Sequence, residues 1–306
     1  MERYNTYKNY LLNKYNDKTY KLSIQIPVTC PNRDGKLGNK GCHFCSEQGT
    51  GFESMAKMTP ILTQLEESKA KVVKRYKAKN FIGYFQNYTN TYLPLDDLMT
   101  YLEEAAKADL VGIDIATRPD SLPEEYLKAI KKFSIEQALD ITFEIGLQIA
   151  NDDLLKSINR GHSVNDYIRS VELIKSYGFS VCTHLILNLP ESTMEDVMTT
   201  VALMNELHVD IVKIHSLYIA KDSVFGDMYE KGEIKICSME EYVNRVVMFI
   251  GYLNSNTVVS RVVSRIPEED GLFSNWGHSW WKIYNEIALQ LEDKNIIQGV
   301  FNESKQ

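Results

Sequence analysis

The 306-residue sequence contains no apolar run close to the roughly 20 residues that a membrane-spanning helix needs. Its first residues, Met1–Asn5, have no apolar core of the kind found in secretory signals, so we expect a soluble protein without a targeting segment. No low-complexity linker interrupts the chain. These absences favour one large α/β domain, or one domain with an appendage, over a string of separate domains.

The chain also lacks an excess of positive charge, because 41 acidic residues outnumber 34 lysines and arginines and the formal net charge is −7. This balance argues against non-specific binding of nucleic acid by bulk charge, and we expect no DNA partner. One stretch, Lys69–Lys79, is an exception in which six of eleven residues are lysine or arginine. It is either a solvated helix face or a local surface that faces RNA.

Cysteine is limited to five residues, an odd number, and three of them cluster near the N-terminus. This usage suits a reducing compartment better than a disulfide framework, so we expect a cytoplasmic protein. Cys182 lies within an apolar run and is interpreted as a buried core residue. Cys237 stands alone.

The clustered cysteines, Cys30, Cys42 and Cys45, form a C-x11-C-x2-C loop with glycine at every third position from 35 to 41. Three thiolates can hold three irons of a [4Fe–4S] cluster and leave the fourth iron open for another ligand. A structural zinc site normally needs four protein ligands, and the sequence has no second cysteine pair. His43, between the two close cysteines, would strain the loop as a ligand of the same metal. The spacing therefore favours a cluster, with zinc as the alternative.

Short apolar segments alternate regularly with amphipathic ones along the first two thirds of the chain. The apolar segments predict strands and the others helices. The predicted strands are 22–29, 81–86, 111–117, 141–148, 181–189 and 211–219, and the predicted helices are 63–77, 95–107, 124–133, 164–177 and 194–207. Two helices have capped starts, with Ser163 before Asp166 and Thr193 before Asp196.

Six strands separated by helices predict right-handed βαβ units and a parallel sheet. Six strands are too few to close an eight-stranded barrel, so the expected α/β fold is a partial, TIM-like (β/α)6 barrel with a packed C-terminal extension. We assign residues 1–20 to an N-terminal extension, 21–220 to the barrel and 221–306 to the C-terminal extension. Ligands of such folds gather at the carboxyl ends of the strands.

The C-terminal extension is predicted to contain a helix at 240–253, a strand at 257–264 and a final helix at 279–291. All three tryptophans, Trp276, Trp280 and Trp281, cluster around the start of that last helix. They either dock the helix or cap the barrel mouth.

Further motifs follow the predicted strands, and together with the cysteine loop they resemble the radical S-adenosylmethionine (SAM) superfamily. The resemblance covers roughly residues 1–300 and is to the branch that contains the Elongator catalytic subunit, most closely to bacterial YtqA/YhcC-like proteins. The first spacing of the cysteine loop is longer than the commoner C-x3-C-x2-C form of the superfamily. The motifs are Tyr84–Thr91 (YFQNYTNT), Ile115–Asp120 (IATRPD), Glu144–Gln148 (EIGLQ), Ile158–His162 (INRGH) and His184–Pro190 (HLILNLP).

The resemblance implies two cofactors, a [4Fe–4S] cluster held by Cys30, Cys42 and Cys45 and SAM bound to its open iron. It implies that a reduced cluster cleaves SAM to a 5′-deoxyadenosyl radical, which abstracts hydrogen from a substrate. A reducing partner such as flavodoxin or ferredoxin is expected with this chemistry. The cofactors carry the difficult chemistry, and the protein orients them and excludes competing reactions.

The resemblance also implies roles in SAM binding for several side chains. Phe44 would pack on adenine, Gln148 would bond the ribose hydroxyls and Arg160 would hold the carboxylate, an ion that the planar guanidinium fork suits. The alternative for Arg160 is an ordinary surface arginine. The family usually has a Gly-Gly-Glu-like turn that receives the amino group of SAM, whereas this sequence has Gln86 and Asn87.

Four charged or titratable residues are candidate ligands of the substrate or cofactor. Glu144 shares a strand face with Gly146 and Gln148, which predicts that it points into the barrel lumen. Arg118 either reads an anionic substrate group or pairs with Asp120. His184 and Lys213 would face the lumen, where a hydrogen-bonded core histidine is the ordinary alternative. The catalytic candidates are therefore Arg118, His184 and Lys213.

Three functions remain open from the sequence. The first is a radical SAM enzyme that acts on tRNA and trims the C5 side chain of a wobble uridine from carboxymethylaminomethyl towards aminomethyl. The second is the same chemistry on a small metabolite or a protein glycine. The third is a non-enzymatic, metal-stabilised binding or electron-transfer module.

Overall fold

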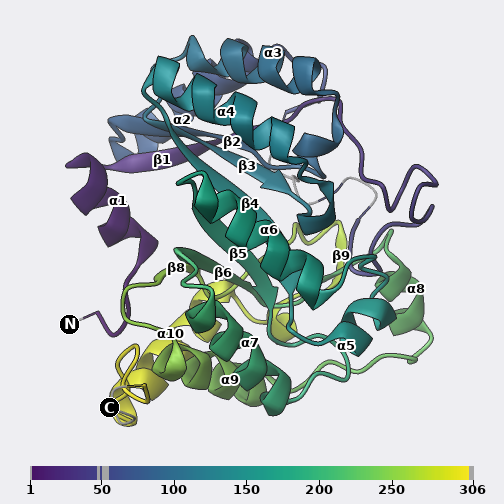
Figure 1. Ribbon diagram of the computed structural model, residues 1–306. Coiled ribbons are helices and arrows are strands. Elements are labelled where there is room, and N and C mark those ends of the chain that lie inside the picture. The colour runs from purple at the N-terminus through teal and green to yellow at the C-terminus, as the bar shows by residue number, and fades with distance from the viewer. Residues whose placement is uncertain (1, 47–48, 50–54, 303–306) are drawn as a thin grey trace.

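The computed structural model describes residues 2–46, 49 and 55–302, and its centre is a curled parallel sheet (Figure 1). Seven strands lie in the order β1-β2-β3-β4-β5-β6-β8, and every neighbouring pair is parallel. The strands are β1 Thr19–Ile24, β2 Asn80–Phe85, β3 Gly112–Thr117, β4 Asp140–Gln148, β5 Ser180–Ile186, β6 Ile211–His215 and β8 Val258–Arg261. The predicted α/β partial barrel is confirmed.

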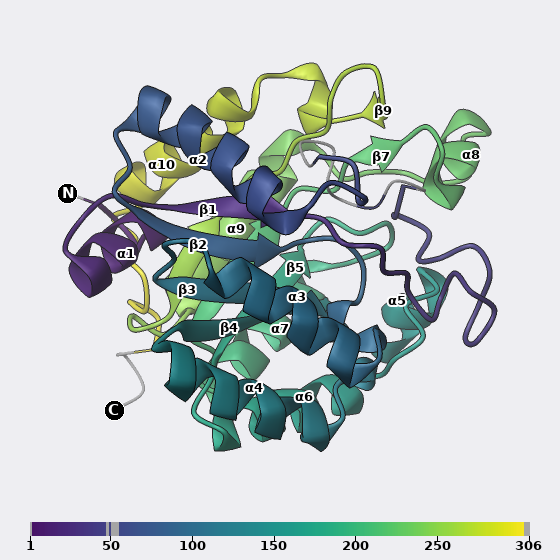
Figure 2. The same ribbon diagram turned by 90° about the horizontal axis from the view of Figure 1, so that it is seen from above.

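Helices connect the strands and cover the outer face of the sheet (Figure 2). Those of the barrel are α2 Ile61–Tyr76, α3 Leu95–Ala106, α4 Glu124–Gln137, α5 Asp152–Ser157, α6 Val164–Ser176 and α7 Met194–Glu206. All six residues of β3 are buried, as expected of a central strand that is covered on both faces. Among the described residues, no helix is long and apolar enough to span a bilayer.

The seventh strand is the main difference from the predicted six. β8 lies within the predicted strand 257–264, but it pairs with β6 and extends the barrel sheet. The chain reaches it through α8 Val224–Glu230 and α9 Met239–Tyr252. A four-residue strand far along the chain carries no local signal of its partner, because pairing of parallel strands is non-local. The domain boundaries at 20 and 220 remain predictions.

Several predicted boundaries shift. β1 begins at Thr19 and ends at Ile24, so the predicted strand 22–29 was displaced towards the cysteine loop. β6 ends at His215 rather than at 219, and Ile219–Ala220 instead form β7, which pairs antiparallel with β9 Gly271–Phe273. The capped helix starts are confirmed, because Ser163 with Asp166 and Thr193 with Asp196 each form a complete capping box.

The C-terminal helix α10, Trp280–Asp293, packs on α9. Its buried residues are Ile283, Ile287 and Leu291, whereas Trp281 is 55% exposed. Trp276 donates its indole N–H to the Cys237 carbonyl at 2.7 Å and packs against Tyr242. The isoleucines and leucine of one helix face, rather than the tryptophans, therefore dock the last helix. The remaining helix, α1 Tyr7–Tyr15, precedes β1.

Candidate functional site

The cysteine loop follows β1 and runs past the carboxyl ends of the strands (Figure 2). All three cysteines line one cavity there, together with residues that end β2, β3 and β4. Parallel strands all end at this edge, so motifs that are distant in the sequence meet there. The lining includes Cys30, Cys42, Cys45, Phe44, Gln86, Arg118, Glu144, Gln148, Arg160 and His184.

Cys42 is the most buried of the three thiols, and it lies beside two donors. Arg160 Nη1 is 3.4 Å from Cys42 Sγ, and Asn32 Nδ2 is 3.5 Å from it. A hydrogen bond from the Cys45 thiol, with the charges of Arg160 and Arg118, holds the pKa of Cys42 well below its ordinary value. A thiolate is the form that ligates iron, and Cys42 is stabilised in that form, whereas the same hydrogen bond raises the pKa of Cys45 well above its ordinary value.

Backbone contacts fix the shape of the loop. The Arg33 guanidinium donates to the carbonyls of Cys45 and Ser46, at 3.2 and 2.5 Å. Gly41 has φ +73°, and a Cβ there would lie 2.9 Å from Arg33 Nε. The glycine is therefore needed both for its left-handed conformation and for the close approach of this arginine.

Two buried arginines reach the cavity, each with one nitrogen that has no partner among the described residues. Arg160 donates from Nη2 to the Gly146 carbonyl at 2.7 Å, and its Nε is unpaired. Arg118 makes a bidentate pair with Asp120, at 2.8 Å for both bonds, and its Nη1 is unpaired. Of the two alternatives for Arg118, the pairing with Asp120 is observed, and its unpaired Nη1 leaves the other open. The surface alternative for Arg160 is wrong, because that residue is 7% exposed.

Other buried polar atoms around the cavity also have no hydrogen-bond partner in the described part of the chain. They include both amide atoms of Asn87 and the Thr89 hydroxyl, which lie just beyond β2. Buried polar groups are almost always satisfied, so unpaired ones indicate a missing polar ligand. Guanidinium nitrogens suit a carboxylate and an amide oxygen suits an ammonium group. These residues therefore fit the amino acid portion of SAM.

Gln148 stands at a distorted strand end. It has φ +80°, and the pairing of β4 with β5 shifts between Gly146 and Gln148. A Cβ at Gly146 would lie 2.6 Å from both Arg160 Nη2 and Gln148 Nε2, so only glycine allows these side chains to converge. His162, which the sequence offered without a role, bonds the Gly146 carbonyl through Nε2 at 3.1 Å. Burial and the nearby charges of Arg160 and Arg118 lower its pKa to about 3, so this imidazole is neutral.

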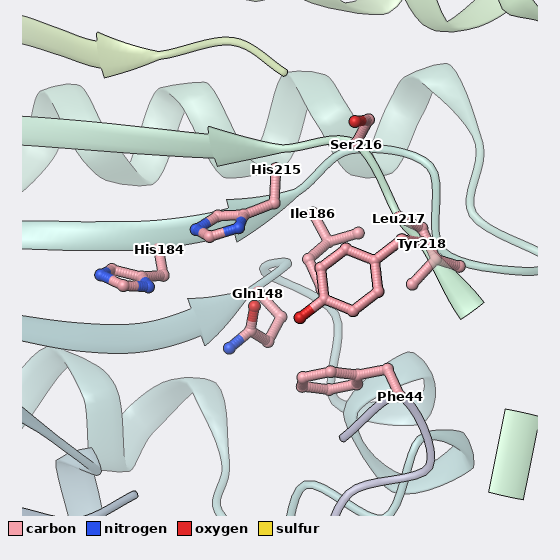
Figure 3. A pocket seen from close by; sticks show the side chains of 8 residues that line it. All are labelled: Phe44, Gln148, His184, Ile186, His215, Ser216, Leu217 and Tyr218. Carbon is pink, nitrogen blue, oxygen red and sulfur yellow. The ribbon is translucent and has the colours of Figure 1, made fainter. Parts of the chain in front are cut away.

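A second cavity continues from the first into the lumen (Figure 3). Phe44 and Tyr218 lie at one side of it and the imidazoles of His184 and His215 at the other, with Gln148 between them. The two imidazoles stack with their centroids 5.1 Å apart. Phe44 and Gln148 line both cavities, so they stand between the cysteines and the lumen.

Glu144 lies at the centre of a buried charged cluster in the lumen. Its Oε1 is 2.5 Å from Lys21 Nζ, and its Oε2 accepts from Lys213 Nζ at 2.7 Å and from the Tyr84 hydroxyl at 2.6 Å. His184 Nε2 is 2.5 Å from the same oxygen. Burial raises the pKa of Glu144, but Lys21 and Lys213 outweigh it and hold that pKa well below its ordinary value.

The cluster includes partners to which no role was assigned from the sequence. Lys21 also contacts Asp114 at 2.5 Å, and Tyr84 receives Lys213 Nζ at 3.2 Å. The period-two pattern of β1, β2 and β3 contained this signal, because each residue lies on the lumen face of its strand. Cys182 is fully buried near Glu144, as predicted, and the two ammonium groups on Glu144 disfavour a metal cation there.

The predicted site residues thus lie either at the carboxyl edge of the sheet or in the lumen of the barrel. Gln86 lines the cysteine cavity, and its Oε1 accepts from the Ser23 hydroxyl at 2.8 Å. His184 and Lys213 face the lumen and contact Glu144, but their assignment as catalytic residues stays a prediction. Asn90, which lies in the motif Tyr84–Thr91 and was assigned no role from the sequence, donates from its amide to the carbonyls of Phe85 and Ala116, at 2.9 and 2.8 Å.

A parallel half-barrel with three converging cysteines at its carboxyl edge, beside unpaired arginine nitrogens, defines a class of iron–sulfur enzymes that bind a charged ligand next to the cluster. The chain belongs to the radical SAM superfamily. The family model "Radical SAM superfamily" matches residues 32–204, and "Radical_SAM C-terminal domain" matches residues 209–293. As a member of this family, the protein is an enzyme that uses a [4Fe–4S] cluster and SAM. The non-enzymatic interpretation is therefore wrong.

Known proteins agree with this assignment. YtqA of Bacillus subtilis is 31% identical over 98% of this chain and 93% of that protein. A tRNA uridine(34) acetyltransferase of Methanocaldococcus infernus is 27% identical over 62% of this chain and 36% of that protein. Among solved structures, the Elp3 of the same archaeon, with an N-terminal deletion, has a TM-score of 0.69 at 18% identity. That match covers 92% of this chain and 64% of the other, and it supports the fold.

Proposed function

We propose that the protein is a tRNA-modifying radical SAM enzyme that trims the C5 side chain of a wobble uridine from carboxymethylaminomethyl towards aminomethyl. The observation that carries the proposal is the similarity to tRNA uridine(34) acetyltransferases over more than half of the chain. The similarity covers only about a third of those longer proteins, so it does not extend to acetyl transfer. What it supports is the nucleotide, uridine 34.

The residues of the site divide between the cofactors and the substrate in this proposal. Cys30, Cys42 and Cys45 would ligate the cluster. The unpaired nitrogens of Arg160 and Arg118 would take the carboxylate of SAM. When bound, the cluster and SAM supply a 5′-deoxyadenosyl radical that abstracts a hydrogen atom from the substrate.

The remaining groups would orient SAM. The Asn87 amide, with Gln86 behind it, would receive the amino group, and Gln148 would bond the ribose. Phe44 would cover the adenine from the loop side, which separates the reacting atoms from solvent. Phe44, Gln86 and Gln148 line the cysteine cavity, and both amide atoms of Asn87 are buried without a partner among the described residues, which supports these roles.

The lumen suits an anionic, glycine-like side chain. His184 and His215 line its cavity, Lys213 donates to Glu144 beside His184, and Arg261 donates to His215 Nδ1 at 2.7 Å. Burial lowers the pKa of His184 to about 4, so the ring is neutral and its one N–H donates to Glu144 Oε2. The carboxylate of a carboxymethylaminomethyl group would be held by this cationic surface, which places its CH2 towards the cysteine cavity. The C–H bond of a CH2 group between an amine and a carboxylate is comparatively weak, which makes it a sensible radical target. Loss of one electron from the resulting carbon radical to the oxidised cluster would give an imine, and water would hydrolyse it to aminomethyl uridine and glyoxylate.

A comparison of tRNA nucleosides from cells with and without the gene tests the proposal. We expect carboxymethylaminomethyl uridines to accumulate in the deletion strain at the expense of aminomethyl uridines and their derivatives. The intact gene should reverse the change and a Cys42→Ala gene should not. Unchanged wobble uridines in the deletion strain would contradict the proposal. In this account the enzyme acts in the cytoplasm and receives electrons from flavodoxin or ferredoxin.

A further inference from the structure

The barrel sheet is open along one side. β1 and β8 are the two edge strands of the sheet, and they do not pair with each other. Helix α1 contacts both of them and lies beside the start of β1 (Figure 1). The C-terminal end of α2 approaches the same place, because Lys79, just beyond that helix, bonds the Lys18 carbonyl at 2.9 Å.

A cavity of about 990 Å³, the seam cavity, occupies this opening. Residues of α1, the start of β1, the end of α2, β6 and the end of β8 line it. Seven of its fourteen lining residues are lysine or arginine and none is acidic. In a chain with a net charge of −7, this is a marked local concentration of positive charge. The seven are Lys8, Lys18, Lys21, Arg75, Lys77, Lys213 and Arg261.

Most of this charge is not neutralised. Lys21 and Lys213 are paired with the carboxylates of the lumen cluster. The other five are exposed, and none of them has a carboxylate within 4.0 Å in the described part of the chain. An open cavity that holds five unpaired cations attracts a polyanion, because surface potentials of one sign are focused in clefts. The five are Lys8, Lys18, Arg75, Lys77 and Arg261.

Aromatic rings lie among these cations. Tyr20 and Tyr76 stack with their centroids 4.8 Å apart and their planes 11° apart. Tyr76 is 37% exposed, and the Arg75 guanidinium lies 5.1 Å from its ring centroid. Cations that follow a phosphate backbone, interleaved with exposed rings on which bases stack, are the features of single-stranded nucleic-acid sites. They distinguish this cavity from a site for an isolated small anion.

The seam cavity also borders the lumen cluster, the buried charged residues around Glu144. Lys21 and Lys213 line the cavity, and each contacts Glu144, which lines the cysteine cavity. Arg261 lines the seam cavity and contacts His215, which lines the lumen cavity. A strand of nucleic acid bound in the seam cavity would therefore lie beside the lumen cluster, which in the proposed function faces the substrate side chain.

We propose that the seam cavity binds the sugar–phosphate backbone of the substrate tRNA, next to the nucleotide whose side chain enters the lumen. This inference rests on the proposed function and adds the surface that holds the RNA. The inference also assigns different roles to the residues of the basic stretch 69–79. Arg75 and Lys77 would face RNA, whereas Lys69 pairs with Asp109 and Lys79 with Asp17.

The test measures the binding of fluorescein-labelled tRNA to the cluster-loaded protein by anisotropy, at several salt concentrations. The seam variant is Lys18→Glu/Lys77→Glu. The control is Lys128→Glu/Lys132→Glu, on the exposed face of helix α4 and outside every cavity named above, which changes the net charge equally. Iron content and SAM cleavage without tRNA should be the same in all three proteins, because neither pair of lysines touches the cofactor site.

We expect the seam variant to raise the Kd at least tenfold and the control to change it less than twofold. The slope of log Kd against log salt should fall by about 1.5 in the seam variant, since each lost phosphate contact removes about 0.7–0.9. Equal Kd values for the two variants, both near wild type, would overturn the seam site and leave the proposed function standing. A wild-type protein that does not bind tRNA would overturn both.

Discussion

Arg160 Nη1 lies 3.4 Å from Cys42 Sγ, and Nη2 of the same guanidinium donates to the Gly146 carbonyl. One side chain thus joins the cysteine loop to the end of β4, where Gln148 lines the lumen cavity. Its remaining nitrogen, Nε, is buried and unpaired among the described residues. Arg160 is therefore placed to hold a ligand between the cluster and the lumen.

Replacement Arg160→Lys should weaken SAM cleavage. Lysine cannot bond Gly146 and reach a carboxylate at the same time, because its ammonium is a single point of charge. A lost charge-assisted bond in a buried site costs about 2–3 kcal/mol, which corresponds to a reduction of about 30- to 150-fold in kcat/KM for SAM. The matched control is Arg169→Lys on an exposed face of α6, which should keep wild-type activity. Equal activity of the two variants would contradict the role of Arg160.

The assignment of cluster ligands is tested by single cysteine replacements. Cys30→Ala, Cys42→Ala and Cys45→Ala should each lose most of the bound iron and the visible absorption of the cluster after anaerobic reconstitution. Cys237→Ala is the control, since Cys237 lies near Trp276 and outside the cysteine cavity. Retention of a full cluster by any of the first three variants would remove that residue from the ligand set.

Glu144 balances the charge of the lumen cluster. Two lysines and two carboxylates make the cluster formally neutral, so Glu144→Gln leaves one buried ammonium uncompensated. We expect this variant to lower the free energy of unfolding by about 3 kcal/mol or more. Adding Lys213→Met restores neutrality, so the double variant should be more stable than Glu144→Gln alone. Denaturant unfolding measures both, and a double variant that is less stable than either single one would contradict this account of the cluster.

The depressed pKa of His184, about 4 in the fold, predicts a pH dependence of stability. The unfolded chain binds a proton near pH 6.5, whereas the folded ring stays neutral until about pH 4. The contribution of the neutral His184 to the free energy of unfolding is therefore complete above pH 6.5 and is lost as the pH falls towards 4. When the pH is lowered from 7.0 to 5.5, His184 alone should lower the free energy of unfolding by about 1 kcal/mol. His184→Gln keeps a donor for Glu144 but does not titrate, so its free energy of unfolding should fall by that much less over the same interval. Identical pH dependence of the two proteins would show that His184 does not titrate as described.

The fold and the cysteines could be predicted from local patterns, because each barrel strand and each capping box is marked by neighbouring residues. The strand that became β8 was predicted within 257–264, but its place in the sheet was not, since four residues give no sign of their distant partner β6. Gln148 and Arg160 were found through motif resemblance. Lys21, Tyr84 and Asp114 were missed because a charged or phenolic side chain in a strand has the same pattern whether it faces solvent or a lumen. The seam cavity joins α1, α2 and β8, and no local pattern shows that they are close together.

The most direct test of the central claim follows a labelled hydrogen. The cluster-loaded enzyme is incubated with SAM, a reductant and tRNA whose wobble carboxymethylaminomethyl group carries deuterium on the CH2 next to its carboxylate. The account predicts 5′-deoxyadenosine that is one mass unit heavier, together with aminomethyl uridine in the tRNA. Unlabelled 5′-deoxyadenosine with an unchanged uridine would contradict it.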